Sequence, residues 1–270
     1  MTSYVIVGAS RGLDYQYLKT LSASPSNIVI GLARSPAPVQ SKVSADNLPS
    51  NVHILHGDLT DPSSLNVAAA QVSKITSGAV DYLIINGALL PYETAHLGPL
   101  DFAGNEQAFM EELNASMSTN VAGVMWTVNA FINLVKNSNV KTVIFISSCM
   151  ADTELIGITG IAAAVPYAVS KAGANVVVAK YAALYKSTGV VFLALGPGFV
   201  QTQAEDPDNV PPELAAVQDA FTVAFRKYEP GLRGPILPEE SVRMQLEVIK
   251  GITIKDSGKF LSHLGTKKML

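Results

Sequence analysis

The sequence predicts an α/β fold in which one doubly wound parallel sheet of about seven strands carries helices on both faces. Short apolar, β-branched runs recur along the chain, and most are continuous rather than alternating, as expected of parallel strands buried on both sides. Helix-like stretches separate these runs, and alternation of β and α units is typical of this architecture. No Ser/Gly/Pro-rich linker and no internal repeat divides the 270 residues, so we expect a single domain over residues 1–270.

Seven segments are predicted as strands, of which the last is the weakest: Tyr4–Gly8, Asn27–Ala33, Val52–Asp58, Val80–Gly87, Val140–Ser148, Val190–Gly196 and Gly258–Leu261. Five helices are predicted between them: Leu13–Ser22, Pro62–Thr76, Glu106–Asn137, Pro166–Lys186 and Pro238–Lys250. The crossovers between parallel strands should be right-handed.

Two segments follow predicted strands but show neither the apolar runs of a strand nor the pattern of a helix. Leu89–Asn105 is rich in Pro, Gly and aromatic residues, and Gln201–Leu237 is rich in Pro and charge. Both should lie at the carboxyl ends of the sheet, where ligands bind in this architecture. Each could be an ordinary surface loop, but the length of Gln201–Leu237 favours a lid over a substrate.

Composition excludes several classes of partner. The net charge is −3, from 19 basic and 22 acidic residues, which gives no reason to expect binding to nucleic acid or to an anionic membrane. Cys149 is the single cysteine, so no internal disulfide can form and we expect a reducing, cytoplasmic location. We expect no signal peptide and no transmembrane helix. The four histidines lack metal-ligand spacing, so no metal site is expected.

The first predicted strand ends in GASRGLD, Gly8–Asp14. Gly8 would allow a sharp turn, and Gly12 would let the backbone approach a pyrophosphate. The helix that follows would offer free N–H groups and the positive end of its dipole to the phosphates. The alternative is a strand–helix turn that binds nothing, but the position between a first strand and a first helix favours a dinucleotide cradle.

This segment resembles the TGxxxGxG cofactor motif of the short-chain dehydrogenase/reductase superfamily, a Rossmann fold that binds NAD(P). The resemblance implies cofactor contacts by the turn residues Gly8, Ser10, Arg11, Gly12 and Leu13. Val7 replaces the motif's threonine and Asp14 its third glycine. A carboxylate at about 4 Å from a phosphate would cost roughly 1–4 kcal/mol, so we expect Asp14→Gly to tighten the cofactor. The alternative for Asp14 is an acid that suits the helix dipole.

The choice of nicotinamide cofactor depends on the end of the second strand. NAD-selective sites usually place an acid there to hold the ribose 2′-OH, but here the strand ends in GLARSP with Arg34 and no acid. Arg11 and Arg34 could together clamp a 2′-phosphate. Each arginine alone could be a solvated surface charge, but the pair favours NADP(H), as the family resemblance also implies.

Other motifs of the family match in order. Asp58 and the adjacent Leu59 stand at the adenine-binding position; Asp58 could instead cap the next helix, although Asp61 suits that role better. Further cofactor contacts are implied for the NAG-like and PG-like motifs: Asn86, Gly87, Ala88, Pro197, Gly198, Val200 and Thr202.

The strongest catalytic signal is YAVSK, Tyr167–Lys171, which matches the family's YxxxK. Residues four apart on a helix share one face, so the phenol and the ammonium can act together. A free tyrosine has a pKa near 10, and a nearby ammonium stabilises the phenolate and lowers that value. Tyr167 could then exchange a proton with a substrate oxygen. The resemblance implies that Lys171 also binds the nicotinamide ribose.

A hydroxyl should hold the substrate oxygen beside the tyrosine. Ser148 matches the family's catalytic serine, and Ser147 is the alternative. The separation from Ser148 to Tyr167 is larger than the family usually shows, so we expect a longer loop there, forming part of the substrate wall. Asn120 matches the asparagine that holds a water for proton relay and completes a tetrad.

These motifs predict an NADPH-dependent oxidoreductase that acts on a ketone, an aldehyde or a secondary alcohol. The C-terminal pattern also resembles cytosolic carbonyl reductases of the C-factor type. A binding or scaffold protein with weak or no catalysis is the main alternative, and an epimerase or dehydratase is a third. The apolar residues Leu90, Tyr92, Met150 and Phe199 suggest an apolar pocket. Trp126 and the apolar stretches of the helices Glu106–Asn137 and Pro166–Lys186 could serve either the core or a subunit interface. The family resemblance implies that these two helices pair subunits, so a homodimer or homotetramer is expected.

Overall fold

The computed structural model describes residues 1–91, 93–202 and 211–270. Seven parallel strands form one sheet in the order β3-β2-β1-β4-β5-β6-β7. Their bounds are β1 Thr2–Val7, β2 Asn27–Ala33, β3 Val52–His56, β4 Tyr82–Ile85, β5 Thr142–Ile146, β6 Val191–Gly196 and β7 Phe260–Ser262. The predicted Rossmann fold is confirmed. The strand order reverses direction between β1 and β4, and such switch points bind ligands at the carboxyl edge.

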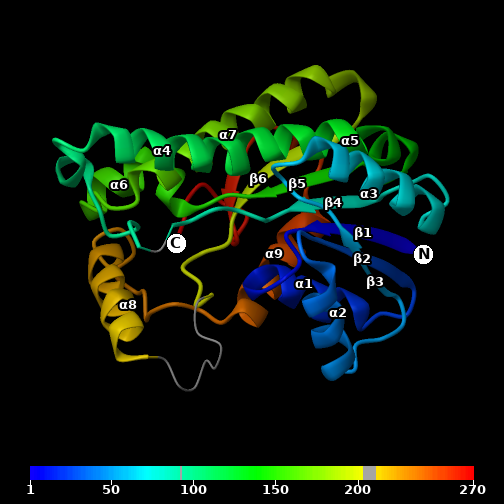
Figure 1. Cartoon of the computed structure of the whole chain (residues 1–270), viewed down its shortest axis with the longest axis horizontal. Helices are drawn as coiled ribbons and strands as arrows, with labels where there is room; N and C mark the ends of the chain where they lie inside the picture. Colours follow the sequence, from blue (N-terminus) through cyan, green and yellow to red (C-terminus); the bar gives the residue numbers. More distant parts are fainter. Residues whose placement is uncertain (92, 203–210) are drawn as a thin grey trace.

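Helices cover both faces of the sheet (Figure 1). On one face lie α3 Pro62–Ile75, α4 Glu106–Met117, α5 Gly123–Asn137 and α7 Val165–Leu184; on the other lie α1 Gly12–Ser22, α2 Pro36–Ala45 and α9 Pro238–Gly251. Each layer buries its own apolar cluster against the strands, because alternate strand residues point to opposite faces. Val7, for example, packs on the α3–α5–α7 side and Ile6 on the α1–α9 side.

The structure differs from the sequence prediction in one long helix. Residues 106–137 form α4 and α5 joined by a π-helical turn, Ser118–Ala122, rather than one regular helix. Short π-helical segments inside α-helices often lie at functional sites. This turn contains Asn120.

Helix α2 was not predicted. It begins with two prolines in its first three residues, and Val39 is its single buried residue. A proline at the first position suits a helix start, but a helix that buries so little has no apolar period to detect.

Two further helices lie within segments that were predicted to lack regular structure. The insertion after Ser148 contains α6, Thr153–Thr159, capped by the Asp152 carboxylate through the Leu155 N–H at 2.8 Å. The segment predicted as a lid contains α8, Pro212–Phe225. Lys227 donates to the Thr159 carbonyl at 3.1 Å, so the ends of α8 and α6 are joined (Figure 1).

Candidate active site at the carboxyl edge of the sheet

The turn after β1 is shaped by close backbone contacts. Gly8 has φ +105°, and a Cβ at this position would lie 2.5 Å from the Gly87 Cα. Helix α1 begins at Gly12, and its N-cap residue Arg11 gives the first turn no side-chain cap. The first N–H groups of the helix therefore remain available to an anion, as a phosphate cradle requires.

The end of β4 forms the opposite wall of this turn. The amides of Asn86 and Gly87 both donate to the Val7 carbonyl, at 3.2 and 2.8 Å. Leu59 is buried against Gly87 and Gly123, so a cofactor could reach only its main chain. Ala88, by contrast, is exposed beside the turn.

Arg11 and Arg34 are both exposed, at the start of α1 and directly after β2. Burial disfavours the Asp58 carboxylate, but hydrogen bonds from the Thr60 amide and hydroxyl, with the charge of Arg34, keep the pKa of Asp58 below its usual value. Asp58 is thus an anion beside the second strand end. The helix cap role belongs to Asp61, whose carboxylate accepts from the Ser63 N–H at 2.9 Å, as expected.

The segment after β6 returns to the glycine turn. Gly198 has φ +87° and packs directly against the His263 ring, while the Pro197 carbonyl accepts from the Ser241 hydroxyl at 2.7 Å. Val200 forms a bridge with Ile236. Beyond it, Thr202 lies within van der Waals reach of a Cβ placed on Gly12, at 3.6 Å. Of the residues predicted in this segment, Thr202 is therefore the one that is shown to approach the glycine turn.

Asp14 lies beneath the glycine turn. Its side chain is 7% exposed, and Oδ1 is buried without a hydrogen-bond partner. The carboxyl contacts Asn86 and the backbone around Gly8, and burial raises its pKa well above the usual value. The group is therefore buried beneath the turn, and the expected effect of Asp14→Gly on cofactor binding stays a prediction.

Tyr167 and Lys171 lie on the first turns of α7. Lys171 is buried, and its Nζ donates to the Ile146 carbonyl at 2.8 Å. Nζ lies 5.8 Å from the centroid of the Tyr167 ring and 4.6 Å from that of Phe145. Burial lowers the pKa of Lys171 to about 7, although the charge of Asp14 opposes this shift. The phenol and the amine thus face one another at the end of β5.

The structure distinguishes the two serines after β5. The Ser147 hydroxyl is buried and donates to Asn175 Oδ1 on α7 at 2.7 Å. The Ser148 side chain is half-buried and accepts from the Met150 N–H at 3.2 Å. Met150 in turn belongs to the apolar cluster that contains Tyr167. Ser147 is therefore engaged with α7, which leaves Ser148 as the candidate for binding a substrate oxygen.

Asn120 is fully buried in the π-helical turn. Its Nδ2 donates to the Leu89 carbonyl and to the Ser170 hydroxyl, both at 2.9 Å, and its Oδ1 accepts from the Leu89 N–H at 2.7 Å. Its carboxamide is engaged with these partners and joins the loop after β4 to α7. Any water held here would have to use the main chain of the turn.

An aromatic cluster lies on the substrate side. Phe199 packs edge-on against Phe225 of α8, with centroids 5.1 Å apart, and Phe221 lies 5.7 Å from Phe225. The C-terminal residues Met269 and Leu270 are buried in the same cluster. Sequence analysis named Phe199 but missed the other residues, although the i, i+4 spacing of Phe221 and Phe225 could have indicated a helix. Tyr92, predicted here, lies outside the described residues.

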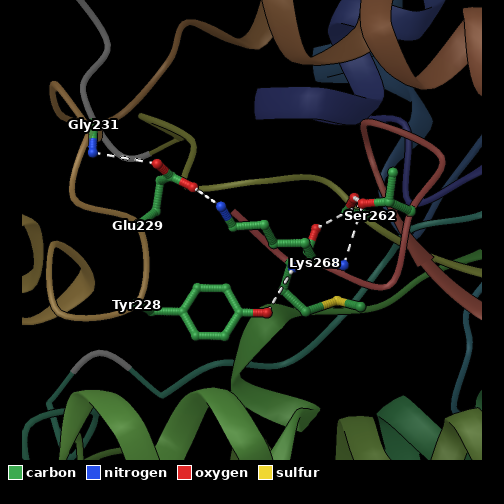
Figure 2. A network of polar contacts seen from close by, with 7 residues as sticks. Tyr228, Glu229, Gly231, Ser262 and Lys268 are labelled. Carbon is green, nitrogen blue, oxygen red and sulfur yellow. Dashed lines mark hydrogen bonds and ion pairs between the residues drawn. The ribbon is translucent and has the colours of Figure 1, made fainter.

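Figure 2 shows how the C-terminal segment is held. Lys268 forms an ion pair with Glu229, whose carboxylate also accepts from the Gly231 N–H, and the Met269 N–H donates to the Tyr228 hydroxyl at 3.3 Å. These contacts tie the end of the chain to the turn after α8.

Three other features carry no chemistry for this site. Burial raises the pKa of the Cys149 thiol to about 12, which disfavours the reactive thiolate. Among the described residues no cluster of His, Cys, Asp or Glu could hold a metal ion. A cavity of about 480 Å³ is lined by residues of α9, by Leu261 of β7 and by His263–Gly265, and none of the residues predicted for the cofactor or the substrate lines it.

Within the same described ranges, none of the helices is both long enough and apolar enough to span a membrane.

Comparison with known proteins agrees with this geometry. The chain is 42% identical over 273 residues to the short-chain dehydrogenase/reductase AacuF of Aspergillus aculeatus, with all of both chains covered. It is 38% identical over 266 residues to the short-chain dehydrogenase/reductase atnB of an Arthrinium species, covering 98% of each.

Solved structures share the fold. An NADPH-bound carbonyl reductase from chicken fatty liver superposes with a TM-score of 0.78 at 22% identity, covering 98% of this chain and 93% of that one. The carbonyl reductase Sniffer of D. melanogaster gives 0.76 at 21% identity, covering 98% of each. The family model described as short chain dehydrogenase matches residues 3–211. The chain is therefore an oxidoreductase of the short-chain dehydrogenase/reductase family.

Proposed function

We propose that this protein is an NADPH-dependent oxidoreductase that reduces a ketone or an aldehyde, or oxidises a secondary alcohol, with Tyr167 as general acid and base. The observation that carries the proposal is the approach of Lys171 to the Tyr167 ring where β5 ends, two residues before Ser148. The switch-point turn of β1 lies at the same edge of the sheet. The proposed proton donor, Tyr167, and the proposed nucleotide-binding turn after β1 would therefore lie at the same edge of the sheet.

The residues present fit a nicotinamide dinucleotide. The turn at Gly8 has no room for a side chain, and the first N–H groups of α1 are uncapped, which suits a pyrophosphate. The exposed guanidinium groups of Arg11 and Arg34 suit a 2′-phosphate, and Asp58 suits the adenine end. The chemistry that NADPH supplies when bound is hydride transfer.

The remaining proposed contacts lie in the turn after β1 and in the segments after β3, β4 and β6, where Val200 would offer main-chain groups and Thr202 would bind the carboxamide or a phosphate. They are Ser10, Leu13, Leu59, Asn86, Gly87, Ala88, Pro197, Gly198, Val200 and Thr202.

Three side chains of the protein would manage the substrate oxygen. Ser148 would donate a hydrogen bond to it, which holds the carbonyl in place as negative charge develops. Tyr167 would transfer its phenolic proton to that oxygen. Lys171, when charged, would stabilise the phenolate that remains and so lower the pKa of the phenol. Asn120 would fix the π-helical turn that supports this arrangement.

The test is cofactor oxidation, followed by absorbance, with a panel of ketones and aldehydes. We expect NADPH to be oxidised with at least one substrate, and more efficiently than NADH. If NADPH binds but no substrate is reduced in either direction, the protein is a cofactor-binding protein and the catalytic proposal is wrong. Comparable use of NADH would contradict the assignment of NADPH.

We also propose a homodimer or homotetramer built on α4, α5 and α7. These helices form one layer, and their outer surface exposes large apolar side chains: Met110, Met125, Trp126, Val169, Val176 and Leu184. Exposed apolar groups gathered on one layer are typical of an interaction surface. Light scattering of the purified protein should give a mass of two or four chains, and a monomer would contradict the proposal. The cytoplasmic location stays a prediction from sequence.

A further inference from the structure

A chain of buried hydrogen bonds joins α1 to the segment after β6 by way of α9. The Tyr17 hydroxyl of α1 donates to Gln245 Oε1 at 2.9 Å, and Gln245 Nε2 donates to the Ser241 hydroxyl at 2.8 Å, both residues being on α9. The Ser241 hydroxyl in turn donates to the Pro197 carbonyl at 2.7 Å. Three segments that are far apart in the sequence are thus connected by consecutive bonds that all run toward Pro197.

The three side chains of this hydrogen-bonded chain lie in an apolar layer. Tyr17, Gln245 and Ser241 are each 0% exposed, among the apolar residues that α1 and α9 bury against the sheet. Burial raises the pKa of Tyr17 well above its usual value, so the phenol keeps the proton that it donates. A buried polar group costs free energy unless it is bonded, and apolar side chains would fill such a layer without that cost. What the bonded chain adds is one fixed arrangement of the three segments.

Two further contacts hold the segment after β6. A Cβ placed on Gly198 would lie 2.9 Å from the His263 ring, so the backbone lies directly against that ring. The Gln201 N–H donates to the Ile236 carbonyl at 3.0 Å, and Ile236 lies two residues before α9 begins. The segment is therefore held near its start by Ser241 and near its end by Ile236, both at the N-terminal end of α9.

The position of this segment explains why its order matters. Thr202, which follows the held stretch, lies 3.6 Å from a Cβ placed on Gly12, where α1 begins. The same helix carries Tyr17, the first donor of the chain. The hydrogen bonds thus connect the helix whose first N–H groups suit the phosphates to the segment proposed to contact the nicotinamide.

We propose that Tyr17, Gln245 and Ser241 are positioning residues that hold the segment after β6 in place for the nicotinamide end of the cofactor. The inference rests on the proposed function. The three side chains act through the Pro197 carbonyl and need no contact of their own with the cofactor. A segment that is ordered before the cofactor binds loses less conformational freedom on binding, which strengthens the complex. The adenine end of the cofactor gains nothing from this order.

The direct test compares two ligands that share the adenine end. NADPH carries the nicotinamide, whereas 2′,5′-ADP carries the adenosine with its two phosphates and lacks the nicotinamide. In Ser241→Ala we expect the dissociation constant of NADPH to rise by about tenfold, the size of one buried hydrogen bond, and that of 2′,5′-ADP to stay within about twofold. Calorimetric titration measures both. Equal weakening of the two ligands, as a general structural defect would produce, or no weakening of either would overturn the inference.

Two further variants sharpen this comparison. Ser22→Ala removes a buried hydroxyl that donates to the Lys19 carbonyl at 3.1 Å, at the other end of α1, and should leave both dissociation constants unchanged. Tyr17→Phe removes the first donor alone and should weaken NADPH binding by about threefold, again with no effect on 2′,5′-ADP. If Ser241→Ala does not fold, Tyr17→Phe decides by the same comparison.

Hydrogen exchange in the protein without cofactor, followed by NMR, tests the positioning separately from the proposed function. The Gln201 amide, bonded to the Ile236 carbonyl, should exchange about tenfold faster in Ser241→Ala. The Gly8 amide, bonded to the Leu32 carbonyl at 2.9 Å, should keep its rate. An unchanged Gln201 rate would overturn the inference even if NADPH binds. A wild type that binds neither NADPH nor NADH would contradict the proposed function, and the exchange rates would still decide whether the chain orders the segment.

Discussion

The cofactor side and the substrate side of this molecule are built from different kinds of contact. On the cofactor side, backbone packs on backbone: a Cβ on Gly8 would come within 2.5 Å of the Gly87 Cα, and one on Gly123, at the start of α5, within 2.9 Å of the Leu59 carbonyl oxygen. On the substrate side, α8 and the C-terminal segment are held by rings and by the ion pair between Lys268 and Glu229 (Figure 2).

This difference decides how freely each side can change. A contact between two main chains admits one residue type, because any side chain collides with it. A cluster of rings admits many combinations of similar volume. The substrate side can therefore vary its pocket while the cradle stays constant, and the effects of substitution should be ordered accordingly.

The largest effect is expected on the cofactor side, for Gly8→Ala. The new Cβ would collide with Gly87, and φ +105° is unfavourable for alanine. Backbone strain and overpacking together should lower the free energy of unfolding by about 2–5 kcal/mol and abolish cofactor binding. The matched control is Gly78→Ala, at φ +85° in open space, which should show the strain alone. Equal losses in a denaturant titration would contradict the backbone contact.

The two serines after β5 give the next effect. Ser148→Ala should lower kcat by about 100-fold, since it removes a donor to the developing oxyanion. Ser147→Ala removes a buried hydrogen bond to Asn175 and should lower the free energy of unfolding by about 1 kcal/mol with little change in kcat. Steady-state kinetics and thermal unfolding of both variants check this. The reverse pattern would make Ser147 the substrate-binding serine.

A smaller effect is expected for Arg34→Asp, at the exposed edge of the cradle. Loss of one charge-assisted contact to a 2′-phosphate should weaken NADPH binding by about tenfold or more, and NADH should lose much less. The measurement is the dissociation constant of NADPH and of NADH, by fluorescence, for the wild type and for Arg34→Asp. NADPH binding equal to that of the wild type would remove Arg34 from the proposed clamp.

The smallest effect is expected on the substrate side, for Lys268→Ala. The lysine side chain is 54% exposed, so loss of its ion pair with Glu229 should change the free energy of unfolding by less than about 1 kcal/mol. A shift in KM without a change in kcat would show that the C-terminal segment shapes the pocket. A loss of stability as large as that of Gly8→Ala would contradict the contrast between the two sides.

The same contrast explains what sequence could predict. The strands were predicted because each is apolar on both faces, and the turn at Gly8 because only glycine fits it. Tyr167 and Lys171 could be paired from their spacing on one helix. These features depend on residue type at fixed positions. The structure has the predicted parallel sheet, and it brings the Lys171 amine to 5.8 Å from the centre of the Tyr167 ring.

Other features depend on contacts that are distant in sequence. Nothing in GASRGLD says that Asp14 turns inward to Asn86, because that partner comes from the end of β4. The engagement of Ser147 with Asn175 decides between the serines, and it too requires the packed structure. Helix α8 was missed because its rings pack on Phe199 and on the C-terminal segment rather than on the sheet.

The most direct measurement of the central claim compares Tyr167→Phe with the wild type for both turnover and NADPH binding. Removal of the phenolic hydroxyl takes away the proposed proton donor and leaves the cradle untouched. The account predicts that kcat falls by at least ~100-fold while the dissociation constant of NADPH stays within about twofold. Near-normal turnover in the variant would contradict the account.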